Sequence, residues 1–485
     1  MSDGASTSDT QPHLRRVLGL WDLVLLGIVA VFNLNLVPPV AAGGYPSISL
    51  WMIGLLFFFL PQGIAVAEFA TRYPEEGGIY LWTKKAFGEF HGFLSGWCYW
   101  TTNVFYIPTL LVYLVGILIF EAGPRVGTFG ESAGFQIVLS MGFLWLFTLA
   151  SIRGLGVNKW MNNLGGVAAI VTTVVLVIVG ILVFRRHGAV TFPGVSGLVP
   201  TLAGWRTMSA LGVICLGLVG LELGSVMGDE IRDPRRNVPR AALLGGLACG
   251  VLYLSATLTL LLALPVKEIS VVTGVLQAFG AMGARVGLSW LHLAVAVILG
   301  ISICGATSAW LSGGARVPFV AGLDRYLPAA FSRLHPRWQT PHVALIAQAV
   351  AASFAIVLSF LGTNVKVREA YNTLLALTVF TQLVPFVYLY GGLMRVAGTP
   401  GGLYRRRLSL WLAGLLGLAA TLAALATAFV PPAEIKFIWR FEIKLFIGLG
   451  LLIGVAAAWF RWFAMRKPAF QRGSNYAGAK AAEGK

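Results

Sequence analysis

The chain has 485 residues, of which 57% are hydrophobic and only 11% are charged. A soluble domain carries about 25% charged residues, so this chain has too few charges to cover a globule in water. Its net charge of +17 suggests a nucleic-acid partner only at first sight, because the basic residues lie in short gaps between apolar stretches. That placement follows the positive-inside rule of membrane proteins, and we expect a membrane protein with no nucleic-acid partner.

Long apolar stretches follow one another along most of the chain. A transmembrane helix needs about 20 apolar residues to cross ~30 Å of hydrocarbon, and lipid forces its backbone to be helical because no water satisfies the peptide groups. The expected fold class is an all-α membrane protein with about 12 transmembrane helices. The predicted spans are 18–41, 47–70, 91–120, 134–153, 160–184, 207–229, 240–263, 287–320, 342–361, 369–395, 409–430 and 441–463.

The two ends of the chain are polar. Residues 1–13 are rich in Ser, Thr and Asp and lack the apolar region of a signal peptide, while residues 471–485 are rich in Gly, Ala and Lys. We interpret both ends as disordered cytoplasmic tails. An even number of spans then places most of the 36 Lys and Arg residues inside, which predicts a multi-pass protein of the inner cell membrane with both termini in the cytoplasm.

Two of the predicted spans are interrupted near the middle. The first reads GIVAVFNLNLVPPVAAGG at 27–44, where Asn33 and Asn35 are followed by two prolines that remove helix donors. The sixth reads LGVICLGLVGLELGSVMGDE at 211–230, with glycines on both sides of Glu222. Non-helical backbone at membrane depth is tolerated where it lines a cavity, so these spans predict a central site. Tolerated glycines and a proline kink are the alternative.

The first and sixth spans hold corresponding positions in two sets of five spans. This is the pattern of an inverted repeat with a substrate site near the midplane between the halves. The predicted organisation is a first five-helix repeat at 14–185, a second inverted repeat at 207–395, and two additional helices at 409–463, flanked by the tails.

Glu222 is a carboxylate in the middle of an apolar span. Such a group costs several kcal/mol unless it is paired, protonated or hydrated, and it is a candidate functional residue for that reason. A neutral acid bonded to freed backbone groups is the alternative. No Lys or Arg lies at comparable depth in the predicted spans, so the site should prefer a cation or a zwitterion to a dianion.

The segment after the sixth span carries a specific motif. GDEIRDPRRNVPRA at 228–241 follows GLE at 220–222, and together they resemble the amino acid–polyamine–organocation (APC) transporter superfamily. Two further segments resemble the same superfamily, AEFATRYPEEGGIYLWTKKAFGEFHGFLSGWCYW at 67–100 and GATSAWLSGGARVPFVAGLDRYLP at 305–328. The resemblance implies a LeuT-like fold with five plus five inverted repeats, two further spans, and alternating access.

The resemblance extends over residues 20–430. LPVKEISVVTGVLQAFG at 264–280 and FVPPAEI at 429–435 look most like the bacterial glutamate/γ-aminobutyrate antiporter branch. Glu230, Asp233 and the arginines after the sixth span are interpreted as an intracellular ion-pair network that latches one face of the transporter.

Candidate site residues follow from the broken spans and, position by position, from the resemblance. In the related arginine/agmatine antiporter, the acid of the G-x-E motif and a third-span tyrosine are linked to proton sensing, and these fall on Glu222 and Tyr99. Ordinary packing is the alternative for the polar positions, because polar groups often join membrane helices. The candidate substrate-binding residues are Asn33, Asn35, Thr102, Asn103, Tyr106, Gly217, Leu218, Gly220, Trp310 and Thr378.

Three positions depart from the pattern of the superfamily. Many members have Gly-Ser-Gly in the first span, whereas this chain reads VFN at 31–33, and asparagine side chains offer a donor and an acceptor as a replacement. The tryptophan gate of the sixth span falls on Leu216, which cannot stack on a cation. The lysine of many proton-coupled members falls on Ala169, which favours exchange over that type of proton symport.

The sequence therefore predicts a secondary transporter of amino acids or related amines, and an antiporter in particular. A proton-coupled symporter and a channel or sensor on a transporter scaffold are the alternatives. A membrane-embedded enzyme is disfavoured, because the six histidines show no metal-ligand spacing and no P-loop is present. We expect no cofactor and no metal. The expected partners are a small-molecule substrate and the lipid bilayer, with a homodimer left open.

Overall fold

The structure is a computed structural model that describes residues 17–130, 132–188, 194–199, 210–360, 367–404, 406–428 and 438–465. Helices dominate these residues, and the described part of the chain contains no β-strand beyond one isolated bridge between Leu18 and Ile231. Eleven of the described helices are long and apolar enough to cross a membrane. The prediction of an all-α multi-pass membrane protein is confirmed. The predicted tails at 1–13 and 471–485 lie outside the described residues.

The first half of the chain runs to the end of the long helix α9. Its elements are α1 (Leu20–Val31), η1 (Leu34–Leu36), α2 (Val37–Ala41), α3 (Pro46–Gly54), the π-helical turn η2 (Leu55–Phe59), α4 (Leu60–Arg72), α5 (Gly78–Phe87), α6 (Glu89–Ala122), η3 (Gly123–Arg125), α7 (Gly127–Gly130), α8 (Ala133–Ile152) and α9 (Leu155–His187).

The second half repeats this alternation of long spans and short connecting helices. Its elements are η4 (Val195–Leu198), α11 (Ala210–Gly217), α12 (Leu223–Val226), η6 (Gly228–Glu230), α13 (Pro234–Ala263), η7 (Val266–Glu268), α14 (Gly274–Val286), α15 (Leu291–Gly314), α16 (Arg316–Leu323), η8 (Ala329–Ser332), α17 (His342–Ser359), α18 (Val367–Val396), α19 (Arg407–Ala428) and α20 (Ile438–Met465).

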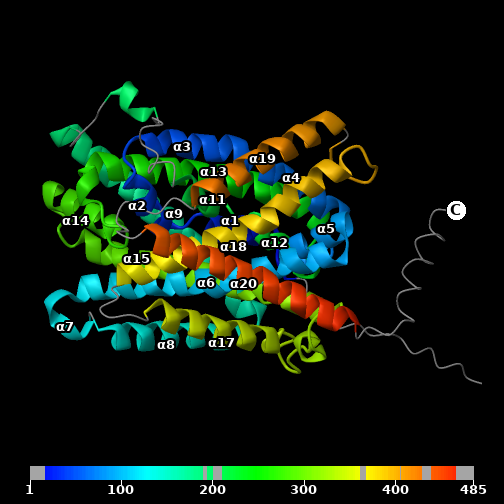
Figure 1. Ribbon diagram of the computed structural model, residues 1–485. Coiled ribbons are helices and arrows are strands. Elements are labelled where there is room, and N and C mark those ends of the chain that lie inside the picture. The colour runs from blue at the N-terminus through cyan, green and yellow to red at the C-terminus, as the bar shows by residue number, and fades with distance from the viewer. Residues whose placement is uncertain are drawn as a thin grey trace, which may run out of the picture.

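The long helices run along one direction of the bundle, with α5 at one end and α7 and α14 at the other (Figure 1). We call these the α5 end and the α14 end. The predicted sixth span at 207–229 is not one helix, because α11 and α12 are separated by non-helical residues. This break explains why it is absent from the eleven long helices, and the count of twelve spans stays a prediction.

The packing of the two halves follows the same scheme. Helix α6 packs against α18, and α15 packs against α9. In the predicted repeat, the third span (α6) corresponds to the eighth (α15), and the fifth (α9) corresponds to the tenth (α18). The pair of α6 and α18 therefore corresponds to the pair of α15 and α9. The short helices α5 and α14 also follow the second and seventh spans, at opposite ends of the bundle (Figure 1). The repeat relation and its boundaries stay predictions that this packing is consistent with.

The spans differ in how deeply they lie within the molecule. In the apolar windows of α1–α2 and of α6, 83% and 78% of the residues are buried, whereas only 6% are buried in the window of α20. The first and third spans therefore form the centre of the bundle, and α20 lies at its periphery with its apolar side chains facing outward.

Candidate functional site

The break in the first span begins where α1 ends at Val31. Phe32 and Asn33 adopt extended backbone, with φ/ψ of −85°/103° and −121°/110°, so the last carbonyls of α1 lose their intrahelical partners. The carbonyl oxygen of Ala30 accepts hydrogen bonds from Asn33 Nδ2 at 2.9 Å and from Trp310 Nε1 at 3.1 Å. Two candidate side chains thus repair the backbone of the broken helix.

Tyr253 of α13 completes this repair from the other side. Its hydroxyl donates to the carbonyl oxygen of Val31 at 2.7 Å and accepts from the backbone N–H of Asn33 at 3.0 Å. The Tyr253 ring stacks on Trp51 of α3, with ring centroids 4.2 Å apart. Sequence reasoning did not single out Tyr253, whose hydroxyl bonds the backbone on both sides of the break.

The break in the sixth span meets the break in the first. Gly220, between α11 and α12, has φ of +132°, a conformation that side-chain-bearing residues rarely adopt. A Cβ atom at this position would lie 3.0 Å from the carbonyl carbon of Ala30. Only glycine therefore satisfies both the backbone conformation and the close approach, and the two broken helices touch at this point.

Glu222 lies beside this contact and is fully buried. Its carboxylate accepts hydrogen bonds from Gln62 Nε2 at 2.9 Å, from the Tyr99 hydroxyl at 3.1 Å and from the backbone N–H of Gly220 at 3.0 Å. The ion pairs found in the described part of the chain do not include Glu222. The acid is thus held by neutral donors from α4, α6 and its own segment.

Aromatic side chains lie next to the same break. The Trp310 ring of α15 meets Tyr106 of α6 edge-on, with centroids 5.5 Å apart, and lies 6.3 Å from the ring of Tyr99. Because Trp310 also bonds the end of α1, it joins the aromatic side chains of α6 to the broken first span.

Asn35 is held by a residue that sequence reasoning also missed. The Tyr371 hydroxyl of α18 donates to the backbone carbonyl of Asn35 at 2.8 Å and accepts from Asn35 Nδ2 at 3.3 Å. The only sequence signal for Tyr371, Tyr253 and Gln62 is a polar group inside an apolar span, and that signal alone does not name the partner.

The remaining polar candidates on α6 and α18 hydrogen-bond within their own helix or to each other's helix. The Thr102 hydroxyl donates to Thr381 Oγ1 at 3.0 Å, and the Thr378 hydroxyl donates to a carbonyl of its own helix at 2.7 Å. Asn103 Nδ2 donates to the carbonyl of Tyr99 at 2.9 Å, while its buried Oδ1 has no partner among the described residues. Of these contacts, only that of Thr102 is of the helix-joining kind considered above.

All candidate substrate residues are buried. Asn33 has the most exposed side chain of the set, at 6%. The backbone of Gly217 is equally confined, because a Cβ atom there would meet the Tyr253 hydroxyl at 3.2 Å and Trp51 at 3.3 Å. The region around the two breaks is therefore closed to solvent in this conformation.

A buried ion-pair cluster lies at the α5 end. Arg316 Nη2 contacts both carboxylate oxygens of Glu230 at 2.7 and 2.8 Å, and Arg316 Nε lies 3.8 Å from Glu76. Burial and the neighbouring Glu230 raise the pKa of Glu76 well above its usual value of 4.5. Burial also raises the pKa of Glu230, although the Arg316 charge opposes this shift. Arg316 is thus the cationic partner of two buried acids.

The same cluster ties the start of the first span to the end of the sixth. The backbone N–H groups of Val17 and Leu18 donate to the carbonyl of Glu230 at 2.9 and 3.1 Å, and Arg232 N–H donates back to Leu18. The sequence assigned the cation of this network to arginines after the sixth span. The partner of Glu230 is instead Arg316, the first residue of α16.

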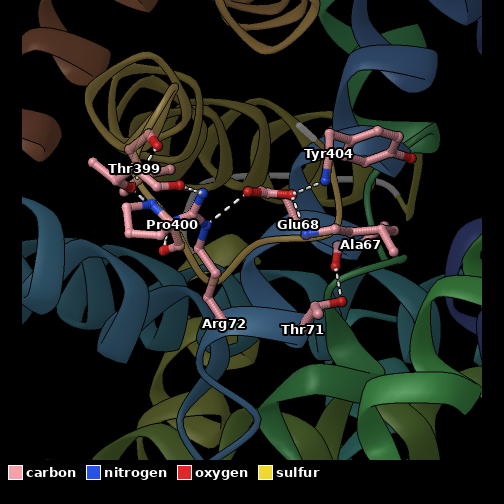
Figure 2. A network of polar contacts seen from close by, with 9 residues as sticks. Ala67, Glu68, Thr71, Arg72, Thr399, Pro400 and Tyr404 are labelled. Carbon is pink, nitrogen blue, oxygen red and sulfur yellow. Dashed lines mark hydrogen bonds and ion pairs between the residues drawn. The ribbon is translucent and has the colours of Figure 1, made fainter. Parts of the chain in front are cut away.

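A second ion pair anchors the loop after α18 (Figure 2). Arg72 Nε contacts Glu68 Oε1 at 2.6 Å on α4, and Arg72 Nη2 donates to the carbonyl of Thr399 at 2.9 Å. Glu68 Oε2 accepts from the backbone N–H groups of Leu403 and Tyr404 at 2.8 and 3.0 Å. The end of α4 and this loop are thereby joined into one unit.

Most of the chain is similar to known proteins. Residues 18–454 match the family described as "Amino acid permease". An uncharacterized transporter of Legionella pneumophila is 25% identical over 92% of this chain and 97% of its own length. A "Probable agmatine/putrescine antiporter" of Lactococcus lactis is 24% identical over 76% of this chain and 78% of its own. A "Putative arginine/ornithine antiporter" of Escherichia coli is 28% identical over 70% and 73%, respectively. The glutamate/γ-aminobutyrate branch stays a prediction.

Proposed function

This chain belongs to the amino acid permease family of the APC superfamily, and we propose that it exchanges amino acids or related amines across the cell membrane by alternating access. Two relatives carry antiporter names, one for agmatine and putrescine and the other for arginine and ornithine. These names support exchange rather than one-way uptake. We place the substrate where the breaks of the first and sixth spans meet.

The contact between the two broken helices beside Glu222 is the observation that carries this proposal. Gly220 lies against Ala30, and Glu222 follows two residues later with its carboxylate fully buried. Interrupted helices persist at membrane depth where they line a site, and paired interruptions mark the site of repeat-built transporters. A purely structural role would not require the two breaks to coincide at a buried acid.

The charge of this region favours a substrate with a cationic amine. Glu222 contributes a carboxylate, and the end of α1 contributes the carbonyl oxygens of Ala30 and Val31. Both carbonyls already accept two side-chain hydrogen bonds, so a substrate amine would displace one of these donors. A dianionic substrate would lie close to the Glu222 carboxylate. No arginine or lysine is bonded to Glu222 among the described residues, and buried like charges repel strongly. Ammonium and guanidinium groups suit this set of acceptors.

Trp310 and Tyr106 support the same choice of substrate. Their rings meet edge-on beside the end of α1, which brings aromatic surface close to the carbonyl acceptors. An ammonium or guanidinium group over such a ring gains roughly 0.5–2 kcal/mol from the cation–π interaction. We assign these two side chains to the wall of the site, and Tyr99 and Glu222 to its proton-linked part.

Alternating access requires a closed face that can open. At the α5 end, closure is supported by the Glu230–Arg316 pair and by the backbone bonds between Leu18 and the segment after Glu230. These contacts link the first, sixth and eighth spans, so they must separate when the substrate leaves on this side.

The test uses purified protein in liposomes loaded with arginine, agmatine, putrescine or glutamate. We expect saturable uptake of labelled arginine or agmatine that requires an amine inside the vesicle, with glutamate unable to replace it. Glu222→Gln should slow this exchange strongly. Glu268→Gln, on the exposed turn η7, is the matched control and should exchange at the wild-type rate.

Three outcomes would overturn parts of the proposal. Uptake that follows an imposed pH gradient and ignores the internal amine would identify a proton-coupled symporter. Uptake without saturation would identify a channel. Exchange of glutamate in preference to the amines would contradict the assignment of Glu222 as the partner of a cationic group.

A further inference from the structure

A partly enclosed cavity of about 180 Å³ lies at the α5 end, between α6, α16, η8 and α20. Trp97 and Trp100 line it from α6, Ala321 from α16, Phe331 from η8 and Trp459 from α20. None of the candidate substrate residues lines this cavity. It is therefore a separate feature that the transport site does not explain.

The lining of the cavity is almost entirely hydrocarbon. The indole nitrogens of Trp97, Trp100 and Trp459 are themselves buried, so they do not face the open space. Tyr80, which also lines the cavity, already donates its hydroxyl to Asp324 at 2.5 Å. The cavity thus suits an apolar molecule.

The cavity reaches the lipid-facing side of the molecule. Trp97, Trp100 and Trp459 are each partly exposed, and α20 leaves Phe446, Leu451 and other apolar side chains exposed along its length. Because α20 is a peripheral span, the solvent at this surface is the acyl region of the bilayer. A molecule that enters from this side is already dissolved in the membrane.

We propose that this cavity binds a segment of one acyl chain of a membrane phospholipid. The size is sufficient for such a segment, since a dry apolar cavity of about 150 Å³ accommodates benzene. The phospholipid is the most abundant apolar molecule at this surface, and its acyl chain matches the hydrocarbon walls.

The position of the cavity connects its occupant to the ion-pair cluster. Arg316, which holds Glu230, begins α16, and Ala321 lines the cavity from the same helix. Beyond α16, Asp324 bonds Lys84 and Tyr80 of α5 at 2.7 and 2.5 Å. A chain between α6 and α16 therefore stabilises the arrangement that closes the α5 end.

The test fills the cavity and measures lipid binding directly, so it does not depend on transport. Wild-type protein, Ala321→Phe and Ala458→Phe are placed in phosphatidylcholine vesicles whose acyl chains carry bromine, which quenches tryptophan fluorescence on contact. Ala321 is buried at the cavity wall, whereas Ala458 is on the exposed face of α20. We expect Ala321→Phe to lose the quenching contributed by the cavity tryptophans, and Ala458→Phe to match the wild type.

A thermal measurement provides the second readout. Long-chain phosphatidylcholine added to detergent-purified protein should raise the unfolding temperature of the wild type and of Ala458→Phe, and this shift should be lost in Ala321→Phe. Ala321→Leu fills less space and serves if the larger variant does not fold.

Two results would overturn the assignment. Equal quenching of the wild type and of a well-folded Ala321→Phe would exclude an acyl chain from the cavity. An equal thermal shift from glycerophosphocholine, which carries the headgroup and no acyl chain, would attribute the effect to the headgroup. The same shift from phosphatidylglycerol and phosphatidylcholine of equal chain length is the expected result.

Discussion

Two buried acids of this protein are stabilised in different ways. Glu222, at the centre, accepts hydrogen bonds from Gln62, Tyr99 and a backbone amide. Glu230, at the α5 end, contacts the guanidinium group of Arg316 through both of its oxygens. Both side chains are fully buried, so the two acids differ in their hydrogen-bonding partners and not in their exposure to solvent.

This difference separates a binding group from a structural one. Neutral donors hold a carboxylate in place without cancelling its charge, so Glu222 retains an attraction for a cation. A bidentate arginine cancels the charge of the acid and fixes its geometry, so Glu230 has little left to offer a ligand. We therefore expect the charge of Glu222 to act on transport and that of Glu230 to act on the stability of the closed face.

The largest of the expected effects is a loss of folding stability in Arg316→Met. Removal of one partner of a buried ion pair leaves the other charge uncompensated and costs about 3–5 kcal/mol. We expect a correspondingly lower unfolding temperature in detergent, measured by differential scanning. The double variant Arg316→Met/Glu230→Leu should recover part of this loss. An unchanged unfolding temperature in the single variant would show that the pair does not stabilise this face.

The second effect concerns Glu222→Gln. The substitution preserves the shape of the side chain and removes its charge, and a hydrogen bond to a charged group contributes roughly 1.5–3 kcal/mol. Exchange in liposomes should fall by about 10- to 100-fold, and the remaining activity should lose its pH dependence. The unfolding temperature should change much less than in Arg316→Met. Wild-type pH dependence in this variant would remove Glu222 from the proton-linked role.

A smaller effect is expected for Tyr371→Phe. The substitution removes one hydroxyl that bonds Asn35 and leaves the ring in place, and a hydrogen bond of this kind contributes about 0.5–1.5 kcal/mol. The apparent substrate affinity should weaken a few-fold, because Asn35 is less firmly oriented. Tyr404→Phe, in the loop between α18 and α19, is the control. Equal effects of the two variants would argue against a role for Asn35.

The smallest change in folding stability at acidic pH is expected for Glu76→Gln. The folded protein binds a proton at Glu76 more tightly than the unfolded chain does, because its pKa is raised above 4.5. The stabilisation from this proton is complete below pH 4.5 and is lost as the pH rises through the raised pKa. Wild type and variant should therefore unfold together near pH 4.5, and the variant should become the more stable one at higher pH. A constant difference between them across the pH range would contradict this assignment.

The features that could be predicted from sequence are those whose cause is local. The break of the first span was predictable because Asn33, Asn35 and the prolines that follow interrupt one apolar run. The break of the sixth span was predictable because glycines surround Glu222 in the same way. Each of these signals is complete within about 20 residues, the length of one span, so hydropathy and composition suffice to detect it.

The partners of these features could not be predicted, because they come from distant spans. Gln62 and Glu222 are 160 positions apart, and Asn35 and Tyr371 are 336 apart. Hydropathy locates a polar group in a span, but it does not give the rotation of the helix that decides which neighbour the group faces. Asn33 illustrates the limit, since its side chain bonds the end of its own helix at Ala30.

The pair of Glu68 and Arg72 has a practical consequence for anyone who labels this protein. Loops between helices are the usual places for an inserted tag or fluorophore, and the segment after Thr399 looks suitable because it lies outside the long helices. Its backbone amides at Leu403 and Tyr404, however, bond the buried carboxylate of Glu68 (Figure 2). An insertion there would uncouple α4 from α18. The backbone hydrogen bonds found for the turn η7 in the described part of the chain are local, within residues 265–269, so η7 is the better site for an insertion.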